Sequence, residues 1–214
     1  MPTPRPTRRL VARALVCGLA VLAAWLGYHY GLSNVIATYR ADRTVDALRR
    51  DWAERGVSAD AGAPRLIEDG EAFAVVRIPA ISASYAWPVA AGMGALDRGF
   101  AWYPGTAQPG QTGNFAVACH RITHGAPCGR LATLKTGDKV VVETRDVDYT
   151  YSIVVAASEL TVPADAGWVL DPVPGRSESV AWEPVLTITT AQDLVLSPDR
   201  SVAFGVLTSK EVKQ

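Results

Sequence analysis

The feature that most limits the possible folds is a series of short runs rich in β-branched and aromatic residues, which begins near residue 71. Turns with Gly or Pro separate these runs, for example at residues 103–105, 108–110 and 135–138. Many short strands with such turns are typical of an all-β barrel or sandwich. About 140 residues can bury a hydrophobic core without the help of disulfide bonds. The expected strands cover residues 72–78, 85–89, 114–120, 139–144, 149–156, 185–190 and 201–207.

The N-terminal residues have a different character. Residues 1–13 carry four arginines and no acidic residue. Residues 14–32 are mostly apolar and carry no charge unless His29 is protonated. With residues 10–13 included, the apolar stretch reaches roughly 20 residues, which is enough to span a bilayer. A cleaved signal peptide shares this pattern, but no Ala-x-Ala site follows the apolar stretch. We therefore expect an uncleaved anchor.

Arginines before an apolar span predict a cytoplasmic N-terminus and an extracellular remainder. Residues 1–9 are thus expected to be a cytoplasmic tail, and residues 10–32 a single-pass transmembrane helix in the cell membrane. Residues 34–55 have alternating charges with apolar positions at Val45, Leu48 and Trp52, which predicts an amphipathic helix. Small and polar residues follow up to Gly70. The expected domains are therefore a helical stalk and linker over 33–70, and a folded domain over 71–214.

Charge and cysteine content exclude several function classes. The chain has 21 basic and 21 acidic residues, and four of the basic ones lie before residue 33, so the remainder has a net charge of −4. No basic patch indicates a nucleic-acid partner. Three cysteines give no disulfide framework, and pairing of Cys119 with Cys128 is not expected. Since no His, Asp or Glu pair has metal-ligand spacing, we expect neither a metal nor another cofactor.

The run at residues 185–200 reads VLTITTAQDLVLSPDR, a β-branched strand followed by a polar loop. Alternation along a strand puts Thr187, Thr189 and Ala191 on one face. Arg200 stands nine positions after Ala191. Upstream, residues 102–114 read WYPGTAQPGQTGN and residues 115–127 read FAVACHRITHGAP.

These runs, with RIPAI at residues 77–81, resemble in order the motifs of the sortase family, the cysteine transpeptidases of Gram-positive surfaces, and in particular its class E branch. The resemblance covers residues from about 72 to 208 and implies an eight-stranded antiparallel β-barrel with short helices. It also implies a site for a sorting-signal peptide such as LAxTG. The family reaction transfers that peptide to an amine of the cell wall through a thioester on the cysteine.

The resemblance also assigns roles to single residues. His120 matches the catalytic histidine, Arg200 the catalytic arginine, and Thr190 the threonine beside the nucleophile. The remaining substrate-binding candidates are Tyr103, which matches a tyrosine typical of class E, together with Trp102 and Thr189. Ala191 stands at the position of the family cysteine.

An alanine has no nucleophilic atom, and loss of the nucleophile from such a catalytic unit costs on the order of six decades in rate. Three hypotheses remain: a natural pseudo-sortase that binds sorting signals, a Cys-to-Ala variant of a working class E sortase, and an enzyme that uses Cys119 or Cys128. Departures from the family at Trp102 and Cys119 as well favour the first. Strand alternation predicts that Cys119 faces away from His120, and His124 is expected to be a solvated loop side chain or a substrate contact.

Overall fold

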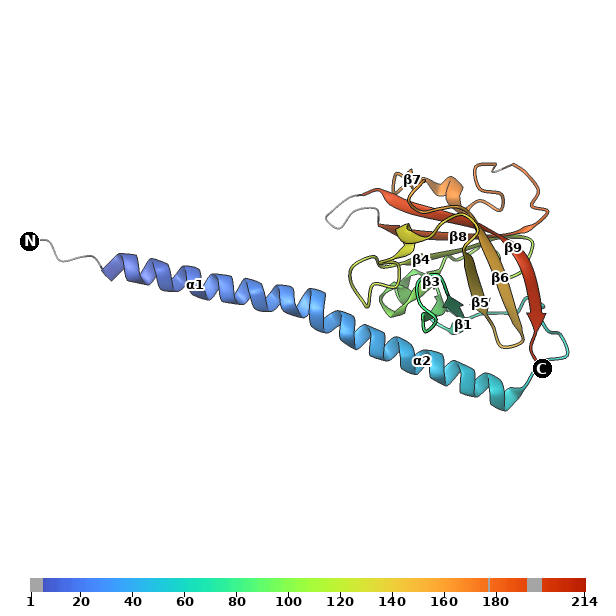
Figure 1. Cartoon of the computed structure of the whole chain (residues 1–214), viewed down its shortest axis with the longest axis horizontal. Helices are drawn as coiled ribbons and strands as arrows, with labels where there is room; N and C mark the ends of the chain where they lie inside the picture. The colour runs from blue at the N-terminus through green and yellow to red at the C-terminus, as the bar shows by residue number, and fades with distance from the viewer. Residues whose placement is uncertain (1–5, 177, 192–197) are drawn as a thin grey trace, which may run out of the picture.

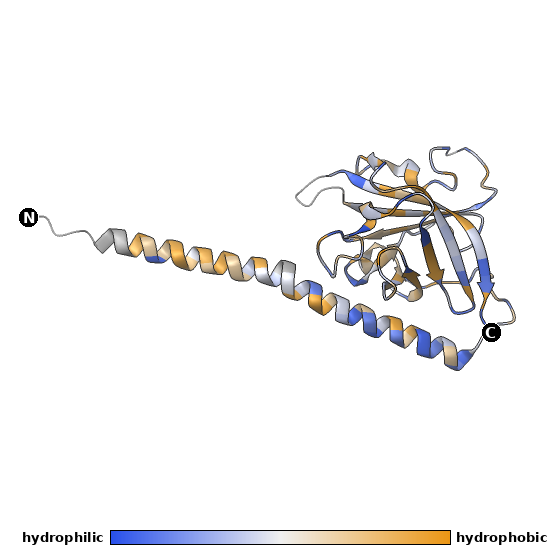
Figure 2. Cartoon of the chain, in the orientation of Figure 1, coloured by the Kyte–Doolittle hydropathy of each residue, from blue (hydrophilic) through white to orange (hydrophobic). Residues whose placement is uncertain are grey.

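The computed structural model describes residues 6–176, 178–191 and 198–214. It consists of a β-barrel and a long helical run whose second half lies beside the barrel and whose first half extends away from it (Figure 1). The run comprises helix α1 (Pro6–Leu26), a π-helical segment η1 (Gly27–Leu32) and helix α2 (Ser33–Arg55). Figure 2 shows mostly apolar residues along α1 and alternating polar and apolar residues along α2. Gly56 ends α2 with a positive φ of 65°, a conformation that glycine adopts without strain.

In the part of the chain that the structure describes, no helix is at once long enough and apolar enough to cross a membrane. The transmembrane helix expected over residues 10–32 is therefore not confirmed.

Helix α2 packs against the barrel, so it is not a freestanding stalk. Its apolar face is buried at Ala41, Val45 and Trp52, and the last two contact Val75 of strand β1 (Ala72–Arg77). Near the C-terminus, Lys213 Nζ lies 4.6 Å from the centre of the Trp52 ring. The helix predicted over residues 34–55 is confirmed, and its amphipathic pattern is explained by this contact.

Eight strands close into the barrel. The order in the sheet is β6-β5-β1-β2-β3-β4-β8-β9-β7, and an additional β6–β9 pairing closes it, while β7 pairs only with β9. Short 3-10 helices η2, η3 and η4 cover residues Met93–Arg98, Leu131–Thr133 and Gly167–Leu170. Besides β1, the strands are β2 (Ala86–Ala91), β3 (Phe100–Trp102), β4 (Gly113–Cys119), β5 (Lys139–Glu143), β6 (Val147–Val155), β7 (Thr161–Val162), β8 (Pro184–Ala191) and β9 (Arg200–Val212).

The predicted eight-stranded barrel is confirmed, but it is not antiparallel throughout. β2 pairs with β3, and β4 pairs with β8, in parallel. A tight hairpin can join only antiparallel strands, whereas β2 and β3 are joined through η2, and β4 and β8 are far apart in the sequence. Strands β3 and β7, which the sequence pattern did not reveal, are only three and two residues long.

The two faces of β4 and β8 do different things. Phe115, Val117 and Cys119 point into the barrel core, where they join Leu186 and Ile188 of β8. On the outer face, small residues of β4, Ala116 and Ala118, pack under the Tyr103 ring. Alternation along β4 thus places Cys119 on the inner face, as predicted, and leaves its outer face for the site.

Candidate active site

The ends of β4, β8 and β9 bring together the three positions that sequence reasoning singled out. Thr189 is aligned with Ala118 in the parallel β4–β8 pair, so His120 and Ala191, two residues further on, leave their strands at the same level. Ala191 is in turn paired with Arg200 across β8–β9. Ala191 is exposed, and the side chains of His120 and Arg200 are half-buried. A histidine, an arginine and a methyl group therefore share one exposed rim.

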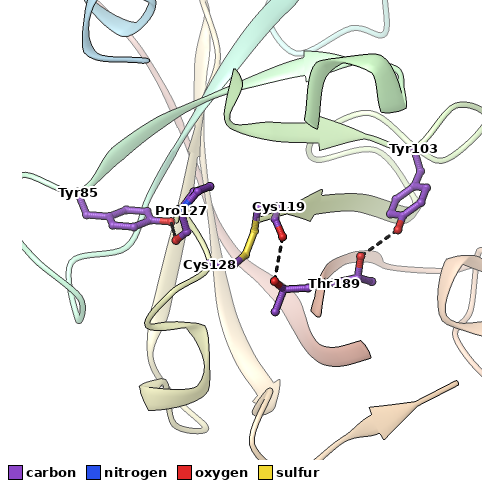
Figure 3. The surroundings of a disulfide bond; sticks show 7 residues. Tyr85, Tyr103, Cys119, Pro127, Cys128 and Thr189 are labelled. Carbon is purple, nitrogen blue, oxygen red and sulfur yellow. Dashed lines mark hydrogen bonds between the residues drawn. A yellow bond between two sulfur atoms is a disulfide. The ribbon is translucent and has the colours of Figure 1, made fainter. Parts of the chain in front are cut away.

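A buried tyrosine holds Arg200 in place. Arg200 Nη1 donates a hydrogen bond of 2.9 Å to the Tyr103 hydroxyl oxygen, and that hydroxyl lies 2.9 Å from Thr189 Oγ1. Because the guanidinium only donates, the Tyr103 hydroxyl oxygen accepts from Arg200, and either hydroxyl can be the donor between Tyr103 and Thr189. Tyr103, Thr189 and Arg200, which the family resemblance singled out, thus form one chain of hydrogen bonds on the outer face of the barrel. Figure 3 shows the bond between Tyr103 and Thr189.

Thr190 and Trp102 do not join this group. Thr190 Oγ1 donates 2.9 Å to the backbone carbonyl of Cys119, so its hydroxyl links β8 to β4. Trp102 lies opposite Val117, whose side chain points into the barrel, and its ring packs edge-on against Phe73 with centroids 5.4 Å apart. Trp102 therefore packs at the edge of the core, and its expected contact with substrate stays a prediction.

His120 has neighbours that the sequence did not reveal. Its Nε2 lies 2.8 Å from Oδ1 of Asp97, which is part of η2, and the contact becomes an ion pair when the ring is protonated. The His124 ring stacks on His120 with centroids 4.5 Å apart, and its Nε2 lies 3.5 Å from the same carboxylate oxygen. Asp97 precedes His120 by 23 residues in no recognisable motif, so only the fold places them together.

Cys119 and Cys128 form a disulfide, contrary to expectation (Figure 3). Their spacing along the chain suggested an extended separation, but the loop after β4 turns back on itself, as the hydrogen bond from Cys128 N to the His120 carbonyl shows. The two Cα atoms are 5.6 Å apart, within the usual range for a disulfide. In this state neither sulfur is a thiolate, and the free cysteine is Cys17 in α1. The hypothesis of a relocated nucleophile at Cys119 or Cys128 loses its support.

Two further features border the site. Arg121 Nη1 lies 3.4 Å from the carbonyl oxygen of Ala191, on the same rim. Residues 192–197, which belong to the polar loop between Ala191 and Arg200, lie outside the described residues. A cavity of about 680 Å³ in the described part of the chain is elsewhere: α2 and residues from 58 to 73 line it, and none of His120, Ala191 and Arg200 does.

Comparison with known proteins agrees with this geometry. A family model described as a sortase domain matches residues 76–208. Sortase SrtE1 of Streptomyces coelicolor is 30% identical over 98% of this chain, which spans 64% of that protein, slightly less than two thirds of its length.

Solved structures extend the comparison. Sortase E from Streptomyces avermitilis is 33% identical, with a TM-score of 0.60 over 68% of this chain and 93% of that one. Sortase E1 from Streptomyces coelicolor, solved with a tripeptide in its active site, is 30% identical, with a TM-score of 0.59 over 69% of this chain and 94% of that one. The family match covers well over half of the chain, and the named relatives are E-type enzymes. The chain belongs to the sortase family and is of the class E type.

Proposed function

We propose that this protein binds LAxTG-type sorting signals at the rim formed by His120, Ala191 and Arg200, and that it does not catalyse the transpeptidation typical of its family. The observation that carries the proposal is the position of Ala191. It is paired with Arg200 on β9 and level with His120 after β4, where the family chemistry needs a cysteine. The tripeptide seen in the active site of the Streptomyces coelicolor relative supports a peptide as the ligand class.

The remaining groups suit peptide binding. The Arg200 guanidinium, held by Tyr103, offers its other N–H donors to a peptide carbonyl. His120 would protonate a leaving amine only after a nucleophile had attacked the carbonyl. With a methyl group at position 191 no thioester forms, so the peptide is expected to dissociate unchanged. A cell-wall amine then has no acyl intermediate to attack.

Membrane attachment is part of the proposal. Many large apolar side chains of α1 are exposed, among them Leu15, Leu19 and Leu22, and arginines precede them in the sequence. We expect this stretch to hold the protein at the cell membrane, with the N-terminus cytoplasmic and the barrel extracellular. A protease added to intact cells should cleave the chain after residue 33 and leave a tag placed before residue 5 intact. Loss of that tag would contradict the orientation.

The test of peptide binding uses the full chain in detergent and a fluorescent LAxTG peptide. The unchanged chain should bind the peptide saturably, without cleavage or transfer. Ala191→Cys should form a covalent adduct, detected as a mass increase that hydroxylamine reverses, because it restores a thiol beside His120 and Arg200. Ala191→Ser is the matched control: it has the same shape but a far weaker nucleophile, and should bind without an adduct.

The outcomes separate the hypotheses. Adduct formation that falls by about two to four decades in Ala191→Cys/His120→Ala assigns acid–base chemistry to His120. Turnover by Ala191→Cys as fast as in a working class E enzyme favours the hypothesis that the chain is a Cys-to-Ala variant of such an enzyme. Absence of both peptide binding and adduct in a chain that circular dichroism shows to be folded would rule out sorting signals as ligands.

A further inference from the structure

Three side chains with metal-ligating atoms converge beside the candidate active site. Asp97 comes from η2, and His120 and His124 come from the loop after β4. One ligand atom from each of the three lies within 4.8 Å of the others. We propose that Asp97, His120 and His124 form a binding site for a divalent transition-metal ion of the zinc type. This site does not depend on peptide binding.

The spacing fits such an ion. Zinc bonds of about 2.0 to 2.1 Å to imidazole nitrogen place neighbouring ligand atoms of a tetrahedral site roughly 3.3 Å apart. The two distances from Asp97 Oδ1 to histidine Nε2 atoms, 2.8 and 3.5 Å, lie on either side of that value. The Asp97 side chain is 67% exposed and the His124 side chain 37%, so both can make the small rotations that bring all three atoms to one ion.

The chemistry of the ligands selects the metal class. Two imidazoles and one carboxylate are a common set for zinc and its neighbours, whereas calcium and magnesium take oxygen ligands almost exclusively. Three protein ligands leave the fourth tetrahedral position open to water or to an external anion. Both rings meet the same carboxylate oxygen, which would carry the negative charge that a dication needs.

The outer contacts of His124 support the same assignment. Its Nδ1 lies 3.1 Å from Thr123 Oγ1. A hydrogen on Nδ1 that donates to this hydroxyl leaves the Nε2 lone pair for a metal, and such partners on the second nitrogen are the rule for ligating histidines.

The loop that carries both histidines is fastened at several points. The Asn34 side chain of α2 donates to Ile122 O at 3.1 Å and accepts from Gly125 N at 2.9 Å. The Cys119–Cys128 disulfide closes the loop at its base. A site whose backbone is already in place costs less conformational entropy to fill.

Metal binding has a consequence for the neighbouring rim. Since Nε2 of His120 cannot hold a proton and a metal ion at once, an occupied site removes this ring from acid–base chemistry.

The test uses the full chain, freed of metal and kept in detergent, with Co²⁺ as a coloured probe. One equivalent of Co²⁺ should give the intense visible absorption of tetrahedral coordination, and Zn²⁺ should abolish it by displacement, whereas Ca²⁺ and Mg²⁺ should not. Asp97→Asn and His124→Ala should each weaken Co²⁺ binding by more than about tenfold. Thr123→Val should weaken it by about tenfold, and Thr123→Ser should restore it. His29→Ala, which removes the third histidine of the chain, is the matched control and should bind normally.

Circular dichroism shows whether each variant is folded. If His124→Ala does not fold, Asp97→Asn still provides the test, because it changes an exposed side chain. A saturable one-to-one signal whose affinity falls by more than about tenfold in Asp97→Asn and is unchanged in His29→Ala supports the site. Absence of that signal in the unchanged chain, or equal affinity in Asp97→Asn, overturns it.

Discussion

Tyr103 connects the arginine of the site to the barrel beneath it. Its hydroxyl accepts from Arg200 and contacts Thr189, and the residue is 9% exposed. Tyr103→Phe removes both hydrogen bonds and should lower the free energy of unfolding by about 1 to 3 kcal/mol, because buried polar partners are left unsatisfied. In the Ala191→Cys background it should also slow adduct formation about fivefold, the rate equivalent of about 1 kcal/mol.

Urea unfolding and mass spectrometry of the adduct measure the two effects. Tyr39→Phe is the control, since Tyr39 is exposed on α2 and should change neither quantity. If Tyr103→Phe lowers stability but leaves the adduct rate unchanged, Tyr103 supports the fold without positioning Arg200.

At the scale of single residues, strand alternation was enough to predict which way Cys119 faces, whereas Ala191 and Arg200 were singled out by the resemblance to sortases and their pairing came from the structure. Side chains alternate on any extended strand, whatever its surroundings. The contact of His120 with Asp97 was not predictable in this way, because Asp97 lies in a 3-10 helix and reaches His120 only through the β2–β3 connection. The disulfide was missed because it depends on the path of an irregular loop.

At the scale of elements, α2 and the loop after β4 are joined through one side chain. Asn34 is hydrogen-bonded to Ile122 O and to Gly125 N, on either side of Thr123 and His124. Asn34→Ala should therefore destabilise this loop by about 1 kcal/mol, because a part-buried backbone N–H and a part-buried carbonyl lose their partners. Amide hydrogen exchange should accelerate at residues 122–125, while the exchange of β4 and β8 stays as in the unchanged chain.

Asn34→Asp is a useful companion variant. A carboxylate still accepts from Gly125 N but cannot donate to Ile122 O, so the exchange rates should fall between those of the unchanged chain and Asn34→Ala. Equal exchange in all three proteins would show that the loop is held without α2.

The longer elements were predictable because each contains enough residues to show the repeat of apolar positions that is typical of a helix or a strand. The burial pattern of β6 alternates along the strand, and β-branched residues fill β8. Which strands pair with one another was harder to predict, since the parallel alignment of β4 with β8 joins strands about 70 residues apart in the sequence. Pairing over such distances is set by the closure of the whole barrel and leaves no local signal.

At the scale of the whole molecule, two buried tyrosines predict how stability changes in alkali. Burial raises the pKa of Tyr85 and of Tyr151 well above the ordinary value near 10. Both stay protonated in the folded protein while the unfolded chain ionises. The stability that they contribute is therefore complete below pH 10 and is lost as pH rises beyond it. Each should contribute a decline of up to about 1.4 kcal/mol per pH unit.

Thermal unfolding followed from pH 8 to 11 checks this slope, which Tyr85→Phe should reduce. That variant also loses the hydrogen bond from the tyrosine hydroxyl to Pro127 O, so its stability should be lower at pH 8 but should fall less steeply above pH 10. Exposed Tyr39 again provides the control, and Tyr39→Phe should keep the original slope. An unchanged slope in Tyr85→Phe would mean that Tyr85 ionises in the folded protein.

The Cys119–Cys128 disulfide links the fold to the compartment in which the barrel resides. Disulfides persist in oxidising surroundings and are rare in the cytosol, so an extracellular barrel should keep this bond and a cytoplasmic one should not. Cells are lysed under denaturing conditions with a maleimide polymer that attaches to free thiols. The chain should then carry one polymer, on Cys17, and it should carry three polymers if the sample is reduced first. Cys17→Ser should give none and two. Loop closure of this length stabilises a fold by about 2 to 3 kcal/mol, so reduction of the purified protein should also lower its unfolding midpoint. Three polymers without reduction would contradict the extracellular location, and the same count from protein exposed to an oxidant would contradict the disulfide itself.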